Sequence, residues 1–293
     1  MHEIALGEVT ITRVVEYFGS VDMTPAEFFP ESSPDSWEEH RHWLEPDFVA
    51  GGEFVAAVQT WVLRSEGRTI LIDTGVGNHR ERPEAPIWDN LETDFPGNLA
   101  RAGVRPEDVD VVVNTHLHVD HVGWNTHREN DSWVPTFPNA TYLIPRRDFD
   151  FWNPANGRQR NRHMFEDSIT PVHQEGRTLL WDDSYRIDGN LRLDLAAGHT
   201  PGSSVVTLES GSDRAVFVGD LMHSAYQFAE PDTNSCFCED PARARATRHR
   251  VLGWAADNNA LVLPAHLGGH GAAEINRDGS RFAIRRWAPF SRL

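Results

Sequence analysis

The chain has 293 residues and carries 27 Lys and Arg against 44 Asp and Glu, which gives a formal net charge of −17 at pH 7. With 39% hydrophobic and 24% charged residues, its composition is that of a globular protein and excludes a disordered chain. The acidic balance also excludes nucleic acid and anionic membrane surfaces as partners, because binding them requires clustered basic residues. The unusual feature is the number of histidines, which is 15.

In chain order, short runs rich in β-branched and aromatic residues predict strands at 9–15, 54–63, 69–72, 109–113, 141–144, 191–195, 204–208, 215–218 and 260–263. Helical patterns occupy residues 97–103, 146–152 and 241–258. Because the helices fall irregularly among the strands, we expect two sheets with helices outside, in a single domain over residues 1–293.

Two long segments do not have the pattern of a core. Residues 22–52 are rich in Pro, Glu and aromatic residues, and residues 80–96 are similar. Loops of this length are usually lids, binding loops or interface arms, so we expect a lid or interface arm at 22–52. A surface segment without function is the alternative.

The first 20 residues contain Glu3, Glu8 and Glu16 and lack the apolar region of a signal peptide. No apolar run approaches the length that spans a bilayer. Two cysteines, Cys236 and Cys238, cannot form a disulfide framework, and we expect both to be packing residues. These features predict a cytoplasmic protein.

A dense cluster of metal-ligand residue types directly follows the predicted strand 109–113. It reads His116-Leu117-His118-Val119-Asp120-His121. Residues i and i+2 of an extended chain point the same way, so His116 and His118 can bind one metal ion. After the chain turns, Asp120 and His121 can face a second ion. Imidazoles and a carboxylate suit Zn²⁺, with Fe, Mn or Co as alternatives.

Three more predicted strands end at a residue of the same kind. These segments are Gly198-His199-Thr200-Pro201-Gly202, Gly219-Asp220 and Pro264-Ala265-His266. Taken singly, His199 or His266 is more often a hydrogen-bonded structural histidine. Strand ends that emerge at one edge of a fold can converge, however, so the set predicts one site.

In this order, the motifs resemble those of the metallo-β-lactamase superfamily, over residues 73–266. The resemblance implies an α/β (α+β) fold, a four-layer αββα sandwich with two metal ions at one edge of the sheets. It also implies that His116, His118 and His199 bind the first ion, that Asp120, His121 and His266 bind the second, and that Asp220 bridges both. Asp73 resembles the aspartate that orients a ligand imidazole, with a simple turn residue as the alternative.

Such a centre predicts hydrolysis. Two divalent ions lower the pKa of a shared water, so a metal-bridging hydroxide is available to attack a carbonyl or phosphoryl centre. Asp120 is then a candidate catalytic residue that steers the nucleophile or passes a proton to the leaving group.

Within the superfamily, Asp220 and the lack of a leader argue against secreted β-lactamases, and the acidic charge argues against RNA-processing members. The remaining similarity is to lactonases and methyl parathion hydrolase, carried by Gly219-Asp220-Leu221-Met222-His223. The best-known acyl homoserine lactonases have a tyrosine three residues after the bridging aspartate, where this chain has His223. We therefore name His223 as a second candidate catalytic residue that donates a proton or hydrogen bond to substrate, with a packing role under the metal loop as the alternative.

We expect a dinuclear zinc-dependent hydrolase of a small neutral ester or lactone, with quorum quenching as its role and organophosphate hydrolysis as a side activity. A mononuclear iron dioxygenase of the same superfamily and a non-catalytic metal-binding module are the alternatives. The expected partner is a small-molecule substrate, and a homodimer is a further expectation. We also expect the basic face of helix 241–258, formed by Arg243, Arg245, Arg248 and Arg250, to be solvated or paired with acids.

Overall fold

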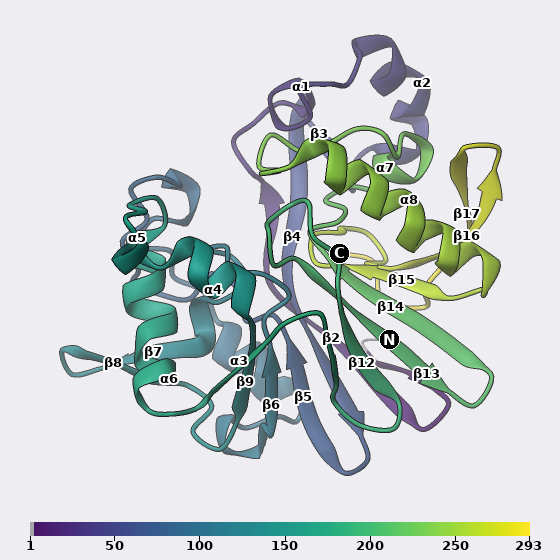
Figure 1. Ribbon diagram of the computed structural model, residues 1–293. Helices are drawn as coiled ribbons and strands as arrows, with labels where there is room; N and C mark the ends of the chain where they lie inside the picture. The colour runs from purple at the N-terminus through teal and green to yellow at the C-terminus, as the bar shows by residue number, and fades with distance from the viewer. Residues whose placement is uncertain (1–2) are drawn as a thin grey trace.

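Two β-sheets face each other in the computed structural model, which describes residues 3–293, and helices lie on their outer faces (Figure 1). The first sheet runs in the order β1 (Glu3–Leu6), β2 (Val9–Ser20), β4 (Glu53–Ser65), β5 (Arg68–Ile72), β6 (Val111–Val113), β9 (Thr141–Pro145) and β10 (Thr178–Trp181), with β3 (Val49–Ala50) paired to β4. The second runs in the order β11 (Ser184–Arg186), β12 (Leu191–Leu195), β13 (Ser204–Ser210), β14 (Asp213–Gly219), β15 (Leu261–Pro264), β16 (Ala273–Asp278) and β17 (Arg281–Trp287). A separate hairpin joins β7 (Thr126–Glu129) and β8 (Ser132–Pro135).

Successive side chains along a strand point to opposite faces of its sheet, one toward the other sheet and the next toward the outer helices. In β5, Ile70 and Ile72 enter the core between the sheets, whereas Leu71 faces the outer helices. In β14, Ala215 and Phe217 likewise enter the central core. Because both faces of these strands are covered, their buried residues 70–72 and 215–218 form continuous apolar runs, as expected for buried strands with a parallel neighbour.

The helices are α1 (Pro25–Phe28), α2 (Pro34–Leu44), α3 (Phe95–Arg101), α4 (Arg146–Trp152), α5 (Arg162–Met164), α6 (Thr170–Gln174), α7 (Tyr226–Ala229) and α8 (Pro241–Asp257). Short 3-10 turns cover Pro86–Trp88, Pro106–Asp108, Gly123–Asn125 and Pro154–Asn156, and a π-helical turn covers Phe165–Ile169. Side chains of α3, α4 and α6 pack on the outer face of the first sheet, and those of α8 pack on the second. The four-layer αββα sandwich is thus confirmed.

Every predicted strand and helix is present, with ends that differ by a few residues. The segment 22–52 is not a plain loop, because it folds into α1 and α2 above the second sheet (Figure 1). A Thr24–Glu27 capping box begins α1, and the Ser33 side chain caps α2. Within residues 3–293, no helix is long and apolar enough to cross a membrane.

One sequence expectation about α8 is wrong. Arg248 is fully buried and not part of a solvated basic face. Its guanidinium donates to the carbonyl oxygens of Leu221 (2.7 Å) and Pro231 (2.8 Å) and to Oδ1 of Asn234 (3.2 Å). Arg245 does fit the expectation, since it pairs with Glu31 at 3.3 Å.

Candidate metal centre

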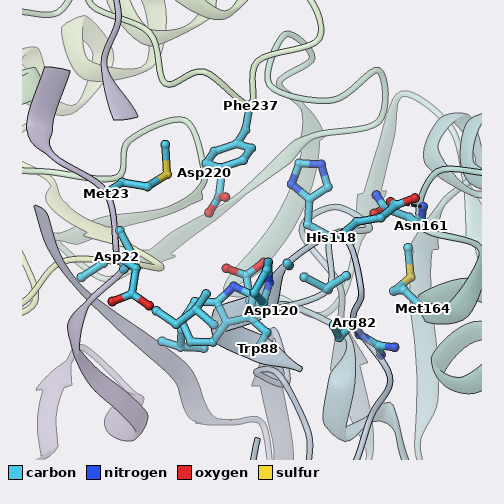
Figure 2. Close-up of a pocket in the computed structure, with 18 of the residues that line it drawn as sticks. Asp22, Met23, Arg82, Trp88, His118, Asp120, Asn161, Met164, Asp220 and Phe237 are labelled. Atoms are coloured by element: carbon cyan, nitrogen blue, oxygen red, sulfur yellow. Dashed lines mark hydrogen bonds between the residues drawn. The ribbon is translucent and has the colours of Figure 1, made fainter. Parts of the chain in front are cut away.

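The predicted motif residues meet at one end of the two sheets, where several strands terminate. The His116–His121 segment follows β6, and Asp220 and His266 follow the parallel strands β14 and β15. His199 lies in the turn between β12 and β13. Figure 2 shows His118, Asp120 and Asp220 directed into a single pocket.

The turn before Asp220 needs a glycine. Gly219 has φ +49°, and a Cβ there would lie 2.7 Å from Oγ1 of Thr115. Only glycine adopts this conformation without cost and also allows the two loops to approach. The Gly219-Asp220 pair therefore brings the carboxylate against the His116 loop.

Three imidazoles and one carboxylate form a first group. Nδ1 of His118 lies 3.1 Å from Nε2 of His116 and 3.0 Å from Nε2 of His199. Oδ2 of Asp220 lies 3.5 Å from Nε2 of His116 and 3.2 Å from Nε2 of His199. All the potential ligand atoms of this group lie within 4.8 Å of one another.

A second group shares the same carboxylate. Nε2 of His121 lies 3.1 Å from Nε2 of His266, and Asp120 approaches these two atoms at 3.7 and 3.6 Å. Oδ1 of Asp220 lies 3.2 Å from Nε2 of His121 and 3.0 Å from Nε2 of His266. The two oxygens of Asp220 thus face different groups.

The outer nitrogen of most of these imidazoles has a protein partner. Nδ1 of His121 contacts Oδ2 of Asp73 at 2.9 Å, and Nδ1 of His266 contacts the carbonyl oxygen of Ala57 at 2.8 Å. Nδ1 of His116 lies 3.1 Å from Oγ1 of Thr115. Such contacts fix ring orientation and direct the opposite nitrogen inward, as in metal-binding histidines.

Burial and the neighbouring imidazoles lower the pKa of both His116 and His118 well below the usual value. Burial opposes ionisation of Asp220, but His121 and His266 hold the pKa of its carboxyl well below the usual range. Burial lowers the pKa of the other three imidazoles, but nearby carboxylates, Asp220 above all, raise it overall, above the usual value for His121 and His266 and to about 9 for His199. A metal ion bound here would displace protons from these imidazoles.

These residues fit divalent metal ions. Pairs of ring nitrogens converge at 3.0–3.1 Å, and Oδ1 of Asp220 is buried without a hydrogen-bond partner. Buried polar atoms that face each other without satisfying one another are costly unless a further group occupies the space between them. Imidazole and carboxylate donors are those preferred by zinc and by other first-row transition metals.

His223 lies beside both groups. Its side chain is 3% exposed, its Nε2 is 3.1 Å from Oδ2 of Asp220, and its ring stacks on His266 with centroids 5.5 Å apart. Phe28 of α1 packs its edge against the His223 ring. Nδ1 of His223 is buried without a hydrogen-bond partner.

Sequence reasoning missed two side chains near the site. The carboxylate of Asp148 is fully buried between the His116 and His199 loops. Cys238 is not a general packing residue, because its Sγ lies 3.7 Å from Nδ1 of His199, while Cys236 is exposed at the pocket wall. Neither role has a local sequence signal, since each depends on segments far apart in the chain.

His270 is not part of the site, and its Nδ1 contacts the carbonyl oxygen of Phe290.

The centre opens into a cavity of about 510 Å³. One side is formed by Met23 and Phe28 from the 22–52 segment together with Phe237. Trp88 comes from the 80–96 segment, and Met164 lies at the opposite end from Met23 (Figure 2). Both long segments therefore contribute walls to the cavity.

The chain belongs to the metallo-beta-lactamase superfamily, since residues 54–266 match that family. Among curated relatives, the N-acyl homoserine lactonase AttM of Azorhizobium caulinodans is 31% identical over 103 residues, which is 34% of this chain and 36% of the relative. The N-acyl homoserine lactonase of Bacillus cereus is 24% identical over 164 residues, covering 52% of this chain and 58% of the relative. The chain thus spans only about a third to three fifths of these relatives.

Similarity to solved structures extends over nearly the whole chain. The hydrolase AbOPH superimposes with a TM-score of 0.78 at 23% identity, over 97% of this chain and 96% of its own. AidC, a dizinc quorum-quenching lactonase in complex with a product, superimposes with a TM-score of 0.77 at 24% identity, over 99% and 97%. At this level of identity, the two structures establish the fold.

Proposed function

We propose that the protein is a metal-dependent hydrolase that binds two zinc ions and opens a small neutral lactone or cleaves a related ester. The observation that carries this proposal is the position of Asp220, whose two oxygens contact two separate clusters of buried histidines. The lactonase relatives support the choice of substrate class. Organophosphate hydrolysis is proposed as a side activity, and the cytoplasm as the place of action.

In this proposal, His116, His118 and His199 would hold one ion, Asp120, His121 and His266 would hold the other, and Asp220 would contribute to both. When bound, the two ions supply an acidified water and positive charge that stabilises the oxyanion of the attacked ester. Proton transfer and substrate binding are then the tasks of the side chains around the centre.

Asp120 is the proposed proton carrier. Both carboxylates line the cavity, but the side chain of Asp120 is 17% exposed and that of Asp220 only 4%. A carboxylate at the boundary between the ligands and the substrate space can accept the proton of the attacking water. It can then return that proton to the departing alkoxide oxygen, which is the alcohol group released when a lactone opens.

His223 is the second proposed catalytic residue. Nε2 of His223 lies 3.1 Å from Oδ2 of Asp220, so the ring helps to keep that carboxylate aligned between the two groups. His223 also lines the cavity, and because its Nδ1 is buried, Nε2 is the atom that can reach a substrate bound beside Asp220. Replacing His223 with Gln should retain part of the Asp220 alignment, and replacing it with Leu should abolish it.

The cavity supports an uncharged substrate with an apolar part. Met23, Phe28, Trp88 and Phe237 provide apolar walls directly beside the centre. The −17 net charge of the chain repels anionic substrates as they approach. A neutral acyl or aryl group attached to a lactone or ester meets both conditions.

The test is a screen of N-acyl homoserine lactones, aryl esters and phosphotriesters on protein of known metal content. We expect turnover of lactones or esters that is lost on chelation and restored by zinc. A protein that contains one iron per chain and consumes oxygen would instead be the mononuclear dioxygenase. A metal-loaded protein that turns over no substrate of any class would contradict enzymatic hydrolysis.

A further inference from the structure

We propose that Asp148 is a positioning residue that sets the metal affinity of the first ligand group and leaves the second group unaffected. The inference rests on the proposed metal binding. It concerns a side chain that contacts neither a proposed ligand atom nor the substrate cavity.

Asp148 lies in the first turn of α4, and its carboxylate is fully buried. Oδ2 accepts the backbone N–H of Leu117 at 2.9 Å and the hydroxyl of Thr200 at 2.7 Å. Oδ1 accepts the backbone N–H of Gly202 at 2.5 Å. No ion pair to Asp148 is found among residues 3–293. Burial raises the pKa of its carboxyl to about 6, and these hydrogen bonds oppose that rise.

The partners of Asp148 are adjacent to the ligands of one group. Leu117 lies between His116 and His118, and Thr200 directly follows His199. One carboxylate therefore joins the two loops that supply all three histidines of the first group. Leu117 shares its loop with Asp120 and His121, but no hydrogen bond of Asp148 is made to a residue adjacent to either of them or to His266.

The contact between Asp148 and the loop after His199 requires a glycine at position 202. A Cβ on Gly202 would lie 2.7 Å from both the backbone nitrogen and Oδ1 of Asp148. Glycine at this position lets the loop after His199 lie directly on the start of α4. The Gly198–Gly202 motif thus has two roles: it positions His199, and its last glycine allows the hydrogen bond to Asp148.

Asp73 is the counterpart for the second group. Its Oδ2 contacts Nδ1 of His121, which is a ligand of the second group, at 2.9 Å. Asp73 also accepts the hydroxyl of Thr115, which contacts Nδ1 of His116, so it contacts the second group directly and the first only through Thr115. Asp148 has bonds next to ligands of the first group alone. Loss of an outer partner of metal ligands typically weakens metal affinity by roughly 10- to 100-fold, so the two halves should respond to different substitutions.

The experiment compares Asp148→Asn, Asp73→Asn and the double variant, each titrated with Zn²⁺ against a chromophoric chelator and with Co²⁺ by absorption. Asp188→Asn is the matched control, because Asp188 is also buried and accepts two backbone N–H groups, from Asn190 and Leu191. Those bonds lie in the turn before β12, at the opposite end of that strand from His199.

We expect Asp148→Asn to weaken one of the two ions by roughly 10- to 100-fold, Asp73→Asn to weaken mainly the other, and the double variant to weaken both. Asp188→Asn should bind both ions like the wild type. If Asp148→Asn does not fold, Thr200→Val removes one of the three bonds and should weaken the same ion by a smaller factor.

Two results would overturn the inference: Asp148→Asn binding both ions with wild-type affinity, or both ions weakening equally. The wild-type titration separates this inference from the proposed function. A wild type that binds no metal refutes metal-dependent hydrolysis, whereas a wild type that binds two ions leaves only the role of Asp148 to be decided by the variants.

Discussion

Oδ2 of Asp73 lies 2.9 Å from Nδ1 of His121, and both side chains are buried. Oδ1 of the same carboxylate accepts the backbone N–H of Thr115 at 2.8 Å. The end of β5 thereby orients an imidazole and also anchors the loop that begins the His116–His121 motif. The first sheet therefore holds in place residues of the candidate metal centre.

Replacing Asp73 with Asn should reduce hydrolysis through metal loss and not through loss of chemistry. The amide keeps the shape but loses the negative charge that favours an N–H on Nδ1 of His121. We expect turnover to fall at low zinc concentration and to recover largely when zinc is added in excess. Steady-state rates across a zinc series would measure this, and a rate that stays low at saturating zinc would contradict it.

Replacing Asp220 with Ala should remove the group shared by both clusters. We expect the bound metal to fall from two ions to one or none and the turnover number to drop by more than about 100-fold, because the variant loses a ligand for each ion. Elemental analysis and lactone hydrolysis on the same preparation measure both effects. Asp232→Ala is a suitable control, since Asp232 is exposed and pairs with His249 and Arg245. Full activity with one bound ion would contradict a dinuclear mechanism.

Phe237 should influence substrate choice at little cost in stability. Its side chain is 38% exposed, lines the cavity and contacts the Phe28 ring with centroids 5.4 Å apart. We expect Phe237→Ala to raise KM for long-chain acyl lactones roughly fivefold, the effect of losing about 1 kcal/mol of apolar contact, with little change for short chains.

The matched control is Phe18→Ala, because Phe18 is 37% exposed and lies outside the cavity lining. Kinetics on acyl chains of two lengths distinguish the variants. Equal KM changes for both chain lengths would show that Phe237 does not contact the acyl group.

Glu16 should make stability depend on pH. Burial raises the pKa of its carboxyl above 4.5, although the Val76 N–H and the Trp124 indole N–H donate to it and act in the opposite direction. With the folded pKa raised, the contribution of Glu16 to the free energy of unfolding is complete below pH 4.5. It is then lost as the pH rises through the folded pKa.

The variant Glu16→Gln lacks this titration. The stability advantage of wild type over the variant should therefore shrink between about pH 4 and pH 7.5. Urea unfolding of metal-free protein at the two pH values measures it. An advantage that grows with pH would mean that the donors to Glu16 outweigh the cost of its burial.

The convergence of the proposed ligand residues could be predicted from the sequence because that information is local. Four ligand residue types lie within six positions after a buried strand, and His199, Asp220 and His266 each follow another strand. The apolar strands form the inner layers of the sandwich, so the residues that follow them meet at one edge of the two sheets. The structure brings together every residue predicted on this basis.

The supporting residues could not be predicted in the same way. Asp148 is bonded to residues 31, 52 and 54 positions away, and within its own segment it is one of several polar residues of a short helix. Arg248 has the spacing of a solvated helix face, and the carbonyl oxygens that accept its N–H groups become visible only when α8 is packed on the loop after Asp220. Both roles depend on tertiary contacts between segments that have no sequence pattern in common.

The most direct test of the central claim is to measure metal content and N-acyl homoserine lactone hydrolysis on the same sample, before and after chelation. The proposal predicts about two zinc ions per chain. It also predicts proton release from lactone opening that disappears with the metal and returns when zinc is restored. Undiminished hydrolysis by metal-free protein would contradict the proposal.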